Sequence, residues 1–103
     1  MSNYALIWGG GDLASGASLR LFRIGIRVLV VETTQPLAVR RSVSFAQAVY
    51  DGETQIEGVT GKLIGEPSEM SACWNEGIIP VIVDPELDLM ENYRPLVLID
   101  ARM

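Results

Sequence analysis

The first indication of the fold is the stretch Tyr4-Ala-Leu-Ile-Trp-Gly-Gly-Gly-Asp-Leu-Ala14. Its five mostly apolar residues stop at three glycines, and this length and ending favour a buried strand over Tyr4–Trp8. A helical pattern follows and ends at Gly25, as a glycine after a helix commonly does. The residues that we expect this helix to turn toward the core fall within an arc of about 100°: Leu13, Ala14, Ala17, Leu21 and Ile24.

Strand-like and helical segments then alternate along the chain. Arg27–Glu32 is almost entirely apolar and β-branched, which is typical of a parallel strand covered on both faces. The other expected elements are a short helix capped by Ser42 or Ser44 and ending near Tyr50, one or two short strands between Thr54 and Ile64, a helix from Pro67 to about Asn75, and strands at Ile78–Val83 and Leu96–Asp100. Such alternation predicts right-handed crossovers and a parallel sheet. We therefore predict one domain, residues 1–103, with an α/β Rossmann-like three-layer fold and a mostly parallel sheet of about five strands.

The composition excludes several classes of function. The chain has no His and one Cys, so it holds no His-dependent catalytic triad, no intrachain disulfide and no Cys or His metal site. We expect no metal centre. A net charge of −5 argues against a general nucleic-acid binder. No apolar run reaches the roughly 18 residues of a membrane helix, and the N-terminus lacks the basic start of a signal peptide. The expected location is the cytoplasm.

The glycine-rich turn is the strongest candidate site. Gly9-x-Gly11-x-x-Ala14 fits the dinucleotide-binding pattern G-x-G-x-x-G/A, and Glu32 follows at the end of the next strand. In that pattern the first glycine permits the turn, the second lets the backbone approach a pyrophosphate, and Ala14 lets the helix pack closely. Glu32 would accept hydrogen bonds from a ribose and repel a 2′-phosphate, which favours NAD over NADP. The candidate cofactor-binding residues are Gly9, Gly10, Gly11, Asp12, Leu13, Ala14 and Glu32.

The same turn has a purely structural interpretation. A glycine-rich first turn can serve the fold alone, and many small domains of this type bind no dinucleotide. The carboxylate of Asp12 would oppose a phosphate, and it is equally suited to capping the helix.

Further segments resemble a known family. They are Gly9–Gly16, Gln35–Phe45, Ala48–Gly52, Val83–Pro85 and Ile99–Met103, together with Glu32. Together they resemble the accessory proteins of selenium-dependent molybdenum hydroxylases, relatives of the XdhC/CoxF maturation factors. The resemblance spans nearly the whole chain, and the stretch from Pro36 to Gly52 is its most specific part.

This resemblance implies a role in handling, sulfurating or inserting the molybdenum cofactor, with an apo molybdenum hydroxylase as partner. It adds Arg40 and Arg41 to the candidate ligand residues, because a guanidinium binds a phosphate in a bidentate manner. The alternative for this pair is surface salt bridges. Family members are about twice as long, so the chain resembles their N-terminal half. Trp8 stands where the family leads us to expect a basic residue.

Three other features have two interpretations each. Asp84 and Asp100 follow expected strands, where they either join Glu32 around one crevice or, as we favour, simply form turns. Cys73 is more typical of a small buried residue than of a sulfur carrier. Leu19 and Phe22 lie off the expected core arc. They therefore either form an interface, with a second copy or with an absent C-terminal half, or are covered by a later segment.

The sequence leaves three functions open. A molybdenum-hydroxylase maturation factor that binds a molybdopterin-type or nucleotide cofactor is the first. The alternatives are an NAD-binding domain of a dehydrogenase-like enzyme and a non-catalytic scaffold. With no His and only one Lys, Lys62, the chain lacks the usual acids and bases of autonomous redox catalysis, so an accessory protein is favoured over an enzyme and no catalytic residue is assigned.

Overall fold

The computed structural model describes residues 3–34, 36 and 44–102. In chain order the elements are β1 (Tyr4–Trp8), α1 (Asp12–Arg23), β2 (Arg27–Glu32), α2 (Gln47–Asp51), β3 (Glu53–Ile56), β4 (Val59–Ile64), the 3₁₀ helix η2 (Pro67–Glu69), α3 (Met70–Asn75), β5 (Ile78–Val83), the 3₁₀ helix η3 (Asp88–Glu91) and β6 (Val97–Asp100). Within these ranges, no helix is both long enough and apolar enough to cross a membrane.

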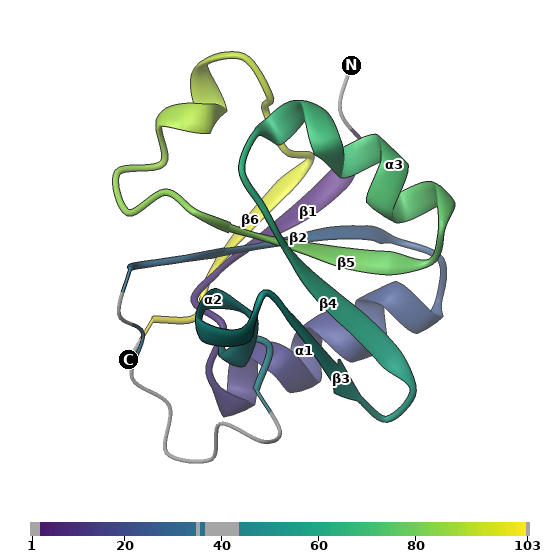
Figure 1. Ribbon diagram of the computed structural model, residues 1–103. Coiled ribbons are helices and arrows are strands. Elements are labelled where there is room, and N and C mark those ends of the chain that lie inside the picture. Colours follow the sequence, from purple (N-terminus) through teal and green to yellow (C-terminus); the bar gives the residue numbers. More distant parts are fainter. Residues whose placement is uncertain (1–2, 35, 37–43, 103) are drawn as a thin grey trace.

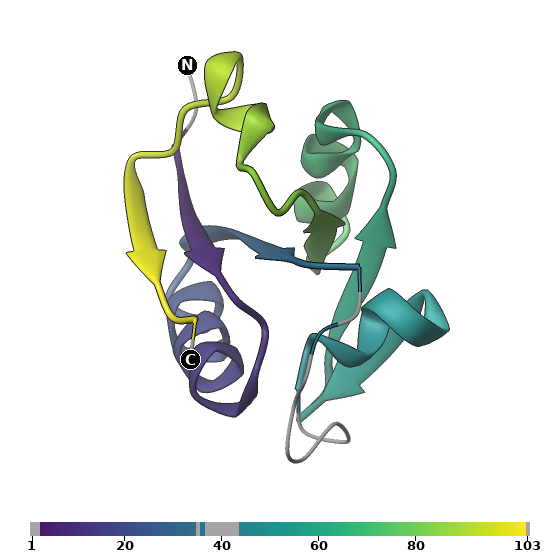
Figure 2. The same ribbon diagram turned by 90° about the vertical axis from the view of Figure 1, so that its left-hand side faces the viewer.

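The strands form one mixed sheet between two layers of helices. Their order is β3-β4-β5-β2-β1-β6, and every neighbouring pair is parallel except β3 with β4. Helices α1 and α2 pack on one face, while α3 and η3 pack on the other (Figures 1 and 2). The predicted α/β class and mostly parallel sheet are confirmed, but the sheet has six strands rather than about five.

The additional strand comes from a tight hairpin. Glu57 and Gly58 both have positive φ, 51° and 84°, which is the backbone of a two-residue turn between antiparallel strands. The Arg23 guanidinium lies 3.0 Å from the Glu57 carboxylate and also donates to the Glu57 carbonyl. A glutamate is not a usual residue for such a turn, so the sequence alone did not separate the two strands.

Alternate residues of the central strands supply the two cores. Val28 and Val30 face the layer that contains α1, while Leu29 and Val31 face the layer that contains α3. All four are fully buried. The prediction that Arg27–Glu32 is covered on both faces is therefore confirmed.

The buried face of α1 differs from the predicted one. Leu13 and Ile24 are exposed, whereas Leu19 is buried and Phe22 packs half-buried against the core. Of the two interpretations of Leu19 and Phe22, the structure therefore agrees with coverage by other parts of the chain rather than with an exposed interface.

Two serines explain this error. Ser15 and Ser18 lie on the buried face of α1, where Ser18 donates to the carbonyl of Ala14 at 2.8 Å. The predicted apolar arc does not contain either serine. Their hydroxyls are small and satisfied by nearby carbonyls, so they can be buried at little cost. The buried face of α1 is therefore rotated about the helix axis relative to the predicted one.

Tyr4 makes the free energy of unfolding depend on pH. Its hydroxyl donates to the backbone carbonyl of Tyr93, and burial raises the pKa of Tyr4 from 10.0 to about 12. Above pH 10 the unfolded chain loses this proton before the folded chain does. Tyr4 therefore adds no pH dependence to the free energy of unfolding below pH 10, and above pH 10 that free energy falls as the pH rises toward 12.

Tyr4→Phe tests this pH dependence. At pH 7 the variant is expected to be less stable by about 1 kcal/mol, because it lacks the hydrogen bond. Between pH 10 and 12 the difference from the wild type should narrow and then change sign, as measured by urea unfolding. A difference that stays constant over this range would contradict the assignment.

Candidate functional site

The glycine turn lies at the edge of the sheet where the parallel strands end. β1 is flanked by β2 on one side and by β6 on the other (Figure 1). After β1 the chain passes through α1 to β2, which pairs with one side of β1. Its last strand, β6, pairs with the other side of β1. In open α/β sheets, ligands bind outside the carboxyl ends of the strands where the strand order reverses in this way. Gly9, Gly10 and Gly11 occupy that point.

Gly9 forms the turn itself. Its φ is +111°, and a Cβ added there would meet the carbonyl carbon and oxygen of Ala101 at 3.2 Å. Its N–H donates to the carbonyl of Val31 at 2.8 Å. Both the conformation and the close approach of the chain after β6 require a glycine here.

Gly10 is the buried inner side of the turn. Its carbonyl accepts hydrogen bonds from the hydroxyls of Ser15 and Ser44 and from the N–H of Ala46. A Cβ on Gly10 would meet the Ala46 nitrogen at 3.1 Å. The segment 44–46 is therefore packed against Gly10, and this part of the turn faces protein.

Gly11 is the open part of the turn. It is the N-cap residue of α1, with φ −73° and no side-chain cap, and a Cβ added to it would meet nothing within 4 Å. The first N–H groups of a helix have no partner within the helix, and the positive end of the helix dipole lies there. This end of α1 therefore offers anion-binding groups with open space in front of Gly11.

The other candidate residues on α1 differ in their burial. Ala14 is buried against the sheet, and Leu13 is exposed. Asp12 lies in the first turn with its Oδ1 atom shielded from solvent. Its charge is favourable at the helix N-terminus but competes with any anion bound at the same place.

Glu32 is directed at the glycine turn from the end of β2. Its Oε2 accepts from the N–H of Gly10 at 2.5 Å, and its Oε1 accepts from the N–H of Thr33 at 2.9 Å. In the structure this carboxylate therefore fixes the turn. Because a carboxylate has about four acceptor positions, the two hydrogen bonds leave capacity for a further donor.

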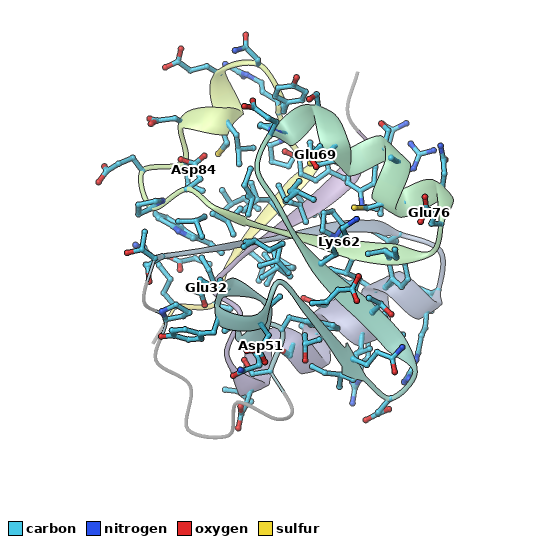
Figure 3. All side chains as sticks on the ribbon, in the orientation of Figure 1. Glu32, Asp51, Lys62, Glu69, Glu76 and Asp84 are labelled. Carbon is cyan, nitrogen blue, oxygen red and sulfur yellow. The ribbon has the colours of Figure 1, made fainter. Side chains whose placement is uncertain are left out.

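The carboxylates of Asp84 and Asp100 each have partners of their own, although the Asp84 N–H donates to the backbone carbonyl of Glu32 at 3.0 Å. The Asp84 carboxylate accepts from the N–H groups of Asp88 and Leu89, at 3.1 and 2.8 Å, so it caps the turn into η3. Figure 3 shows Glu32 and Asp84 at the edge where β2 and β5 end, and it shows Glu69 and Glu76 at the two ends of α3, just outside the helix. No group of three or more potential metal ligands occurs among the described residues. For both aspartates the structure agrees with the favoured turn interpretation.

Asp100 instead pairs with Arg102. The guanidinium donates two hydrogen bonds to the carboxylate, at 2.8 and 2.7 Å. These hydrogen bonds lower the pKa of Asp100 to about 2. The same guanidinium lies 3.4 Å from the ring centroid of Trp8, and the N–H of Ala101 donates to the Trp8 carbonyl at 2.9 Å.

Sequence reasoning missed Arg102 at this edge. Trp8 occupies the position where a basic residue was expected, and Arg102 brings a positive charge to the same place from a distant part of the chain. Only the parallel pairing of β1 with β6 brings the two together. The local signal was the Asp-x-Arg sequence that follows the last apolar run.

The remaining candidates lie elsewhere. Arg40 and Arg41 are outside the described residues. Cys73 is buried in the layer that contains α3, and burial raises the pKa of its thiol. A buried thiol with a raised pKa has little thiolate, which agrees with the interpretation of Cys73 as a small buried residue.

The chain is similar to a protein that is itself described as uncharacterized. It is 44% identical over 96 residues to the uncharacterized protein YqeB of Escherichia coli strain K12. The match covers 93% of this chain but 18% of that relative, so the chain corresponds to a small part of a much longer protein. No protein-family model matches the chain, and no solved structure matches it significantly.

Proposed function

We propose that this chain is a Rossmann-like domain of a molybdenum-hydroxylase maturation factor. Its glycine turn binds the phosphate of a nucleotide- or pterin-type cofactor, and the domain assists in handling the molybdenum cofactor or delivering it to an apo-hydroxylase. The cofactor is cargo in this role. The protein holds and presents it, and no catalytic step is assigned to this chain.

The observation that carries the proposal is the uncapped N-terminus of α1 beside Gly11. The positive end of a helix dipole, the absence of a side-chain cap and open space beside Gly11 all favour a bound phosphate. The turn is fixed by hydrogen bonds of Gly10 with the Glu32 carboxylate and the Ser44 hydroxyl. A preorganised turn loses little conformational entropy on binding, which favours affinity.

The resemblance to the maturation factors supplies the ligand class. Trp8 and Arg102 lie against each other at the neighbouring ends of β1 and β6. Arg40 and Arg41 remain candidates for phosphate contact because they fall in the most specific part of the resemblance.

One observation favours the scaffold alternative. The segment 44–46 is packed on Gly10, so part of the turn serves the fold rather than a ligand. The alternative of an NAD-binding domain depends on Glu32, whose carboxylate is already engaged by Gly10 and Thr33. A ribose would have to use its remaining acceptor positions.

A thermal-shift titration with matched glycine variants tests the proposal. The compounds are a molybdopterin compound, NAD, NADP, ATP and GTP. At 100 times its dissociation constant, a ligand is expected to stabilise the domain by about 2.7 kcal/mol, a shift of several degrees in Tm. Gly11→Val fills the open space before the helix, and we expect it to abolish the shift.

Gly16→Ala is the matched control. A Cβ at Gly16 also meets nothing within 4 Å, and Gly16 lies inside α1 away from the turn. It should retain the full shift. Stabilisation by the pterin compound that Gly11→Val removes supports the proposal. Stabilisation by NAD alone overturns it in favour of the dehydrogenase-like alternative, and no response to any compound overturns it in favour of the scaffold.

A further inference from the structure

β6 leaves the last edge of the sheet unpaired. It pairs with β1, and no other described strand adjoins it. Its residues are unusually apolar for an exposed edge: Leu96 just before it is 78% exposed, and Val97 and Leu98 are also exposed. The strand itself contains no Lys or Pro, the residues that commonly protect an edge, although Pro95 stands just before it. Such an edge is a template for pairing with another strand.

The opposite edge of the sheet provides a contrast. There β3 is exposed through Glu53 and Gln55, and it ends in a hairpin turn that carries Glu57. Polar and charged side chains of this kind discourage pairing of a short edge strand. The apolar character is therefore particular to β6.

An apolar groove adjoins β6 on the face covered by α1. It has a volume of about 470 Å³ and lies at the amino ends of β1 and β6. Its apolar lining includes Tyr4, Leu21, Ile26, Leu96, Val97 and Ile99. The same surface therefore presents a protruding side chain, Leu96, and a hollow. A two-fold interface requires one patch to be complementary to itself in this way.

The sequence around β6 is self-complementary in one antiparallel register. When Val97 faces Val97 of a second copy, Leu96 faces Leu98 and Arg94 faces Asp100. Apolar residues then meet apolar residues, Pro95 faces Ile99, and Arg94 meets Asp100, whose carboxylate also binds Arg102 of its own chain. Shifting the register by two residues, so that Leu98 faces itself, places Arg94 opposite Arg102 and Leu96 opposite Asp100. Like charges directly opposite are destabilising.

We propose that two copies of this chain associate through β6, antiparallel and with Val97 at the two-fold axis, to form one continuous sheet. The apolar groove of each copy is covered at this interface. The inference rests on the exposed edge, the groove and the charge pattern, and it is independent of the proposed function.

Sedimentation or light scattering of the intact chain tests the association. We expect a dimer whose dissociation constant rises by about a hundredfold in Leu96→Lys, because each dimer loses two apolar contacts. Leu13→Lys is the matched control, since Leu13 is 76% exposed but lies at the N-terminus of α1. It should leave the dimer intact. Circular dichroism checks that both variants are folded.

Cross-linking tests the register in a Cys73→Ser background. In antiparallel strands, directly opposed Cα atoms lie about 4.5–5.5 Å apart, within the range of a disulfide. Val97→Cys should therefore form a disulfide-linked dimer under mild oxidation. Leu98→Cys should not, because in this register its two copies are offset along the strands.

A charge reversal completes the test. Arg94→Glu and Asp100→Arg should each weaken the dimer, and the double variant should restore part of it. A chain that stays monomeric at high concentration overturns the proposal and leaves β6 to a further segment of a longer protein or to another partner. A dimer that survives Leu96→Lys, or that is linked through Leu98→Cys instead of Val97→Cys, also overturns it.

Discussion

Phe45→Ala is expected to lower the free energy of unfolding by about 3–5 kcal/mol. Phe45 is completely buried in the layer that contains α1 and α2. Small domains have only about 5–15 kcal/mol of stability in total, so this substitution removes a large share of it. Urea unfolding followed by circular dichroism measures the loss. If the variant does not fold, Phe45→Leu provides a milder form of the same test.

The ring of Phe45 packs directly against Gly61. A Cβ added to Gly61 in β4 would lie 2.5 Å from Cδ1 of Phe45. Gly61→Ala should therefore cost about 1–3 kcal/mol through overpacking. In a Phe45→Leu background the clash is relieved, so the two substitutions together should cost less than the sum of their separate effects, by about 0.5–3 kcal/mol.

Gly16→Ala is the control for this cycle as well. It adds the same methyl group where nothing lies within 4 Å, in the interior of α1, and it should raise stability by about 0.5–1 kcal/mol. Effects of Phe45→Leu and Gly61→Ala that simply add would contradict the contact between them.

Glu32→Ala is expected to lower the free energy of unfolding by about 1.5–3 kcal/mol in the absence of any ligand. Gly10 is buried, and its N–H donates to the Glu32 carboxylate at 2.5 Å. Removing the carboxylate leaves that donor without its charged acceptor. Glu32→Gln keeps an acceptor oxygen in place and should cost about half as much.

Amide exchange of Gly10 gives this prediction a local measurement. Its exchange should accelerate in Glu32→Ala and less so in Glu32→Gln. Glu53→Ala, which removes an exposed carboxylate from the distant edge strand β3, should change stability by less than about 0.5 kcal/mol. Unchanged stability and unchanged Gly10 exchange in Glu32→Ala would show that the carboxylate does not hold the turn.

This structural role of Glu32 matters for any binding experiment. Loss of ligand binding in Glu32→Ala would follow either from a lost ribose contact or from a loosened turn. Gly11→Val separates the two, because Gly11 has an ordinary φ and open space at its Cβ. Its effect on a ligand is therefore steric, and its effect on the turn is small.

Local sequence patterns were sufficient for the main elements of the fold. The strands at Tyr4–Trp8, Arg27–Glu32 and Ile78–Val83 occur as predicted, because continuous apolar runs that end at glycine, acidic or proline residues have few alternatives. The glycine turn between β1 and α1 was also recognisable, since Gly9 needs its positive φ for a local reason. The alternation of elements indicated the parallel sheet.

The surroundings of each side chain required the tertiary structure. The packing of segment 44–46 on Gly10, the hydrogen bond from Gly10 to Glu32 and the stacking of Arg102 on Trp8 join residues that are far apart in the sequence. The buried hydroxyl of Ser15 donates to the carbonyl of Gly10 and accepts from the N–H of Phe45, which lies 30 residues along the chain. A residue's local pattern does not contain these partners. Short-range propensity therefore determines where strands and helices form, whereas long-range pairing of β1 with β6 and of Gly10 with segment 44–46 determines which faces are buried and which part of the turn stays open.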